Sequence, residues 1–247
     1  MTSETRHLLH SAALQHVAPA FRDALQKFNK RLDSLFGARL LNWTIFGFAA
    51  TGEQPTPEHR AQHVLVLDRV DLDPLRQLAP EGLTFGPVGL AAPLIMTPAY
   101  VQTSLDAFPL EFIEIHQQHV TLLGEDLFGP LEFRDADVRL ACEREVKALL
   151  LGMRQGLLSS GEDAVLLAAV ERGATISLAR LLAGLAWLKG ERIYAAPADR
   201  LTQIENATGR SLTAARTSLV PRQRCEYRQF ANFYDDLETP RKIIDAR

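Results

Sequence analysis

The sequence is poor in cysteine and has no long uninterrupted hydrophobic run. Its two cysteines, Cys142 and Cys225, lie far apart and form no CxxC pair. This argues against a disulfide framework and a cysteine metal site, and it predicts reduced, buried thiols. The most apolar stretch, residues 176–188, contains Arg180 and is shorter than the roughly 20 residues of a membrane span. It therefore predicts a buried helix.

An excess of charge of either sign is also lacking. The chain has 27 basic and 30 acidic residues, for a formal net charge of -3. No global field attracts a nucleic-acid backbone or an anionic membrane, so neither is predicted as a partner. The start, MTSETRHLLH, lacks the basic segment and apolar core of a signal peptide. We therefore expect a cytoplasmic protein.

Several catalytic signatures are absent from the sequence. It contains no P-loop, no dinucleotide-binding glycine motif, no GxSxG elbow and no HExxH motif. Two histidine pairs, His59 with His63 and His116 with His119, have metal-ligand spacing. A zinc site needs three or four converging ligands, and no cysteine accompanies these pairs. We predict ordinary surface histidines and no metal site.

Helix and strand patterns alternate through the first half of the chain. Residues 10–36 have helical periodicity, with a break at Pro19 and a stop at Gly37. The apolar runs 40–49 and 63–68 predict strands joined by an irregular loop.

Two capped helices and a hairpin follow these strands. Residues 71–80 predict a short helix capped by Asp71, and residues 97–108 predict one capped by Thr97. From Pro109, the sequence PLEFIEIHQQHVTLLGED predicts a strand, a tight connection and a second strand.

The second half contains only helical patterns. A long helix begins at Asp135, with its apolar residues in one core-facing stripe, and SSGED at 159–163 is the best hinge or boundary. Further helices are predicted at 163–172, 174–189, 197–208, 211–219 and 223–238. We predict an α+β protein with a small mixed sheet and helices at 1–130, followed by an all-α bundle at 131–247.

The order of these elements carries a family resemblance. The strand and glycine of TIFGF, the strand HVLVLD, the segment FPLEFIEIHQQHVTLLGEDLFG and the helices after it occupy nearly the whole chain. In this order they resemble the nucleotidyltransferase superfamily, which includes DNA polymerase beta and the minimal bacterial nucleotidyltransferases. The ending LLGED-L ahead of a long helix resembles bacterial nucleotidyltransferase-like proteins in particular.

The resemblance implies positions for the site residues. Gly47 matches the glycine whose backbone approaches the nucleotide phosphates, and Phe48 stands at the serine that follows it. The paired carboxylates that hold Mg²⁺ in the family correspond to Ala61 and His63. Glu111, on the predicted later strand, corresponds to the third acid and is the candidate catalytic residue.

Two basic residues of the long helix are candidate nucleotide ligands. Lys147 and Arg154 share a stripe with Glu143 beside the apolar face, and Arg139 lies at its border. One interpretation is a row of ion pairs at i, i+4 spacing. The other is that Lys147 and Arg154 bind a phosphate or an acidic partner.

The sequence thus favours a degenerate nucleotidyltransferase-like protein, a noncatalytic module that binds a nucleotide or a protein partner without a cofactor. One alternative is an active, divergent, Mg²⁺-dependent nucleotidyltransferase acting on a protein or nucleic-acid acceptor. In that case Glu111, with Asp106 or Asp68, rebuilds a metal site. A third interpretation is a structural homo-oligomer that associates through helix 174–189.

Overall fold

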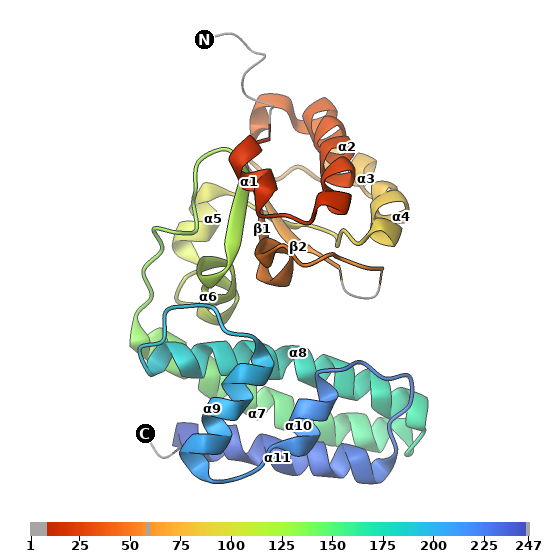
Figure 1. Ribbon diagram of the computed structural model, residues 1–247, viewed down its shortest axis with the longest axis vertical. Coiled ribbons are helices and arrows are strands. Elements are labelled where there is room, and N and C mark those ends of the chain that lie inside the picture. Colours follow the sequence, from red (N-terminus) through yellow and green to blue (C-terminus); the bar gives the residue numbers. More distant parts are fainter. Residues whose placement is uncertain (1–8, 58–59, 246–247) are drawn as a thin grey trace. The chain divides into compact units, whose positions relative to one another are not determined.

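The alternating first half of the sequence forms a four-stranded mixed sheet. The structure is a computed structural model, and it describes residues 9–57 and 60–245 (Figure 1). The chain divides into two units, Met1–Leu105 with Glu114–Glu132, and Asp106–Ile113 with Phe133–Arg247. The main boundary lies close to the predicted one at 130/131, but a short segment before it belongs with the second unit.

The sheet of the first unit has the strand order β3-β2-β1-β4. Strand β1 pairs antiparallel with both β2 and β4, whereas β2 and β3 run parallel. The strands are β1 (Leu40–Phe46), β2 (Gln62–Leu67), β3 (Leu94–Met96) and β4 (His119–Leu123). The first predicted strand is shorter than expected, because Gly47 begins a 3-10 turn, η3 (Gly47–Thr51).

Helices of the first unit begin and end where local signals place them. Pro19 is the first residue of α2, and Gly37 ends it at a φ of 50°. Asp71 caps α3 by accepting from the Asp73 amide, and Thr97 caps α5 by accepting from the Tyr100 amide. The helices are α1 (Ser11–Gln15), α2 (Pro19–Phe36), α3 (Leu72–Leu78), α4 (Glu81–Phe85) and α5 (Pro98–Thr103). The described residues also form the 3-10 turns η2 (Gly37–Arg39) and η4 (Gly86–Val88).

One face of the sheet packs against α2. Phe21, Leu25 and Phe28 of this helix are buried with Trp43 of β1 and Leu65 of β2. Complete burial of side chains of this size contributes roughly 1.5–3 kcal/mol each. The core therefore holds the strand pair β1–β2 in one register.

The predicted strand at Phe108 is wrong, because Pro109–Gln117 forms the helix α6 and only His119–Leu123 forms a strand. Leu110, Phe112, Ile113 and Ile115 are all buried in α6. A short helix buried on several sides gives a nearly continuous apolar run, and such a run cannot be told from a strand by periodicity.

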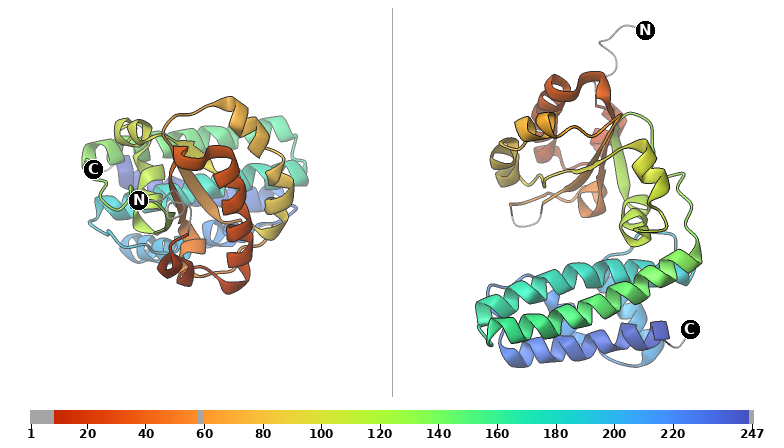
Figure 2. Two further views of the ribbon diagram at one scale, coloured as in Figure 1. Left: turned by 90° about the horizontal axis from the view of Figure 1, so that it is seen from above. Right: turned by 180° about the vertical axis from the view of Figure 1, so that it is seen from behind.

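The second unit is a helical bundle. Helix α8 packs against α7, and α11 lies along α7 (Figure 2). The core joins Val146 of α7, Leu181 of α8 and Phe233 of α11. Its helices are α7 (Asp135–Ser160), α8 (Ala164–Leu188), α9 (Pro197–Thr208), α10 (Thr213–Ser218) and α11 (Tyr227–Asp245). The predicted α+β architecture, a mixed sheet followed by a helical region, is confirmed.

Two expectations about the second unit are wrong. Residues 159–163 are not a boundary but the turn between α7 and α8, and α8 runs without a break where two helices were predicted. Gly173 stands between the two predicted helices. A glycine inside a helix costs only about 1 kcal/mol relative to alanine, and burial of Leu167 and Leu178 in α8 offsets this cost.

Helix α8 carries both buried and exposed apolar side chains. Leu181, Leu182 and Leu185 are buried in the core of the second unit, whereas Ile176 of the segment 174–189 is exposed, and association of copies through this helix stays a prediction. No helix in the described part of the chain combines the length and apolarity needed to cross a bilayer.

Candidate functional site

The candidate site of the first unit begins where β1 ends at Gly47. This residue has a φ of 69°, in the left-handed region that glycine adopts without steric cost. Its amide donates a 2.8 Å hydrogen bond to the Gln118 carbonyl, which ties the turn to the residue before β4. The sharp change of direction after β1 therefore accounts for a glycine at position 47.

Phe48 follows Gly47 at the position that the resemblance assigns to a phosphate-facing serine. Its side chain is partly buried and packs against the hydrophobic core of the first unit. An aromatic ring offers no hydrogen bond to a phosphate oxygen. The side chain at this position contributes packing.

Ala61 and His63 occupy the positions of the paired carboxylates. Ala61 is fully buried, and its amide and carbonyl bond to Gly89 and Ala91 at 2.8 and 3.0 Å. His63 is also fully buried, so the prediction of a surface histidine is wrong for this residue. Its predicted metal-spacing partner, His59, lies outside the described residues.

His63 uses both ring nitrogens in hydrogen bonds. The Trp43 indole Nε1–H donates to His63 Nδ1 at 3.1 Å, and His63 Nε2 lies 2.8 Å from the Ala91 carbonyl oxygen. Because an indole N–H only donates and a carbonyl only accepts, the Nε2–H tautomer satisfies both bonds. Burial lowers the pKa of His63 to about 4, against the opposing hydrogen bond to Ala91. His63 is thus a neutral group of the core with no nitrogen left for a metal.

Glu111 lies in the first turn of α6, within the segment that belongs to the second unit. One carboxylate oxygen, Oε1, is 3.5 Å from an Arg180 guanidinium nitrogen of α8, and both side chains are partly exposed. The expectation that Glu111 lies on a strand is wrong, because the segment is helical. Its contact with Arg180 is an ion pair rather than a metal site.

The two other acids considered for a rebuilt metal site are exposed. Asp68 follows β2, and Asp106 precedes α6. Among the described residues there is no group of three or more His, Cys, Asp or Glu side chains that could hold a metal ion.

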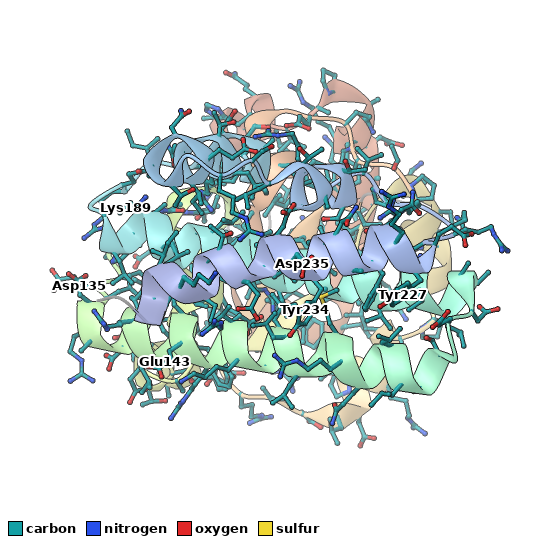
Figure 3. The ribbon with its side chains drawn as sticks, turned by 90° about the horizontal axis from the view of Figure 1, so that it is seen from below. Asp135, Glu143, Lys189, Tyr227, Tyr234 and Asp235 are labelled. Carbon is teal, nitrogen blue, oxygen red and sulfur yellow. The ribbon has the colours of Figure 1, made fainter. Side chains whose placement is uncertain are left out.

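Lys147 and Arg154 make contacts within the bundle. Lys147 forms an ion pair with Glu143 one turn earlier, and the hydrogen bond and charge of Lys147 lower the pKa of Glu143. Arg154 donates through Nε to the Tyr234 hydroxyl at 2.7 Å, and its guanidinium carbon lies 5.5 Å from that ring's centre. Figure 3 shows Glu143 on α7 and Tyr234 on the neighbouring α11. The i, i+4 ion pair of the first interpretation is present.

The LLGED segment holds a pair of side chains, Asp126 and His119, that the sequence did not predict. The Asp126 Oδ1 atom accepts from the amides of Phe128 and Gly129, both at 2.9 Å, and lies 3.0 Å from His119 Nε2. Burial raises the pKa of Asp126, but the bonds from Gly129 and Phe128 and the adjacent His119 outweigh it and hold the pKa below its usual range. An aspartate in a loop commonly accepts a hydrogen bond from the backbone amide two residues later, and Asp126 is the sequence signal for this turn.

Gly124 in the same segment is fixed by a close backbone approach. Its φ is 83°, and a Cβ atom there would lie 2.0 Å from the Leu41 carbonyl oxygen. The LLGED segment thus anchors the end of β4 beside β1.

The predicted site residues therefore divide between the units. Gly47 and Phe48 belong to the first unit, whereas Glu111, Lys147 and Arg154 belong to the second. Each has a structural partner inside its own unit. A scan of the sequence against protein-family models found no match, and a search of curated proteins also found none.

Proposed function

We propose that this chain is a degenerate nucleotidyltransferase-like protein that acts as a noncatalytic, partner-binding module. The resemblance rests on the order α2, β1, Gly47 turn, β2, α3, β3, followed by the bundle. The observation that carries the noncatalytic role is the state of His63, which is buried, neutral and bonded through both nitrogens.

Metal-dependent transfer needs ligands that this arrangement does not offer. Mg²⁺ is held by oxygen ligands, usually one or two carboxylates together with the substrate phosphates. Ala61 has no ligand atom, His63 has no unused nitrogen, and Glu111 faces Arg180. The noncatalytic module accordingly requires no cofactor, and Mg²⁺ belongs only to the alternative of an active transferase.

A protein partner is favoured over a nucleotide by the neighbours of the candidate nucleotide ligands. Phe48 packs into the core, Lys147 is neutralised by Glu143, and the Nε–H of Arg154 is used by Tyr234. Binding of a triphosphate without a metal ion requires several Lys or Arg side chains whose charges are not already paired with carboxylates.

The experiment is a transfer assay on the full chain with each labelled nucleoside triphosphate and Mg²⁺ or Mn²⁺. We expect no incorporation into the protein itself, an added protein or an added nucleic acid. Incorporation by the wild type that Glu111→Gln abolishes would establish the active transferase instead.

A calorimetric titration with the same nucleotides separates nucleotide binding from partner binding. We expect no saturable heat. Saturable binding that the exposed double variant Lys147→Gln with Arg154→Gln abolishes would show that the module binds a nucleotide. A partner identified by cross-linking is then purified, and we expect it to bind equally with and without a chelator.

A further inference from the structure

A polar cleft lies in the second unit between α10 and α11. It has a volume of about 470 Å³, within the range of small-molecule sites. Hydroxyl, amide and carboxylate side chains dominate its lining, among them Thr213, Thr217, Gln229, Asn232, Asp235 and Asp236. None of these residues was singled out by sequence motifs, and none belongs to the site of the first unit. We call it the α10–α11 cleft.

Asp236 is the buried acid of this cleft. Its exposed fraction is 9%, and its Oδ2 atom accepts a 3.0 Å hydrogen bond from the Ala215 amide. Among the described residues, its other oxygen accepts no hydrogen bond and no cation forms an ion pair with it. This second oxygen is not one of the fully buried polar atoms without a hydrogen-bond partner, so it is accessible from the cleft. The lining thus contains an uncompensated negative charge.

Asp235 adds a second uncompensated carboxylate. It is exposed on α11 (Figure 3), and within the described ranges its side chain has no ion-pair partner. Arg210 approaches only its backbone, donating to the Asp235 carbonyl at 2.9 Å. Both carboxylates therefore remain available to a ligand.

The cation in the cleft lining is already neutralised. Arg222 donates through Nε to Glu171 at 2.6 Å and through a second nitrogen to the other carboxylate oxygen. This hydrogen bonding raises the pKa of Arg222, and Glu171 is almost completely buried. With Arg222 and Glu171 cancelling each other, Asp235 and Asp236 leave the cleft negative.

We propose that the α10–α11 cleft binds a small organic polyamine through at least two ammonium groups. Successive residues on a helix point about 100° apart, so Asp235 and Asp236 suit separated charges on an extended molecule. A single hard metal ion would need about six oxygen ligands around one point. The hydroxyls of Thr213 and Thr217 and the amide oxygen of Asn232 offer acceptors for the remaining N–H bonds, whereas Gln229 Oε1 already accepts from the Glu226 amide. The inference is independent of the role of the first unit.

The test is isothermal titration of the full chain with spermidine at constant ionic strength. We expect saturable binding to the wild type and at least about tenfold weaker binding to Asp235→Asn and to Asp236→Asn, because each substitution removes one negative charge from the cleft. Asp199→Asn, an exposed aspartate of α9 outside the cleft lining, is the matched control and should bind like the wild type.

Both substitutions should leave the protein folded. Asp235 is exposed, so its replacement does not disturb the core, and the asparagine oxygen of Asp236→Asn can still accept from Ala215. Absence of spermidine binding, or equal binding by wild type and both variants, would overturn the proposal. The proposal would also be overturned if Mg²⁺, added at the same total positive charge, displaced all bound spermidine, or if maltose bound as tightly as spermidine.

Discussion

The Trp43 indole donates a hydrogen bond to the His63 imidazole, and both side chains are fully buried against Phe28. They come from the antiparallel strands β1 and β2, where Trp43 lies opposite Leu65 and His63 lies opposite Ile45. Trp43 and His63 are therefore diagonal neighbours on one face of the sheet. This pairing makes a residue at a predicted metal position part of the core.

His63 should make the stability of the first unit depend on pH. Its folded pKa of about 4 lies below the ordinary 6.5, so the unfolded chain binds more protons between these values. The free energy of unfolding should therefore fall as pH falls from about 6.5 toward 4, by up to about 1.4 kcal/mol per pH unit. Urea unfolding followed by tryptophan fluorescence measures this slope. His63→Gln should reduce this slope by the amount that corresponds to uptake of up to one proton on unfolding. An unchanged slope would contradict the lowered pKa of His63.

Removing the indole N–H should destabilise the first unit more than a change in packing alone. Trp43→Phe leaves a smaller ring in the core and leaves Nδ1 of His63 without its donor. We expect a loss of about 2–4 kcal/mol in the free energy of unfolding. The double variant Trp43→Phe with His63→Leu should lose less free energy of unfolding than the sum of the losses in the two single variants. Strict additivity would show that the bond contributes nothing.

The carboxylate of Asp126 should stabilise the loop after β4. Asp126→Ala removes the acceptor for Phe128, Gly129 and His119, and we expect a loss of about 1 kcal/mol because the side chain is half exposed. Since the pKa of Asp126 is lowered by folding, this stability is present above the ordinary carboxyl range and is lost as pH falls through the folded pKa. Chemical denaturation at neutral and acidic pH measures both effects. The neighbouring exposed Glu125→Ala should change stability by less than about 0.5 kcal/mol.

Two glycine-to-alanine substitutions should have opposite signs. Gly124→Ala places a Cβ against the Leu41 carbonyl at a positive φ, so we expect a loss of more than about 3 kcal/mol. Gly173→Ala lies in the middle of α8, where a Cβ meets no neighbour within 4 Å, so we expect a gain of about 0.5–1 kcal/mol. Thermal unfolding followed by circular dichroism compares them. A stabilising Gly124→Ala would refute the packing of Gly124 on β1.

The sequence determined the features that depend on neighbours along the chain. Pro19, Asp71 and Thr97 set helix starts, because a fixed φ or a side-chain acceptor acts within one turn. Helical periodicity likewise predicted α2, α7 and the bundle, and the α+β order followed from it.

Only the tertiary structure decided the site. The sequence could not place Glu111 on a helix, because its segment is buried on several sides and lacks the period that separates helix from strand. His63 is neutral because Trp43 of another strand and Ala91 of a later loop reach its two nitrogens. Asp235 and Asp236 line a cleft with α10 only after the bundle closes. Burial and hydrogen bonding between distant segments set these properties, and no local pattern encodes them.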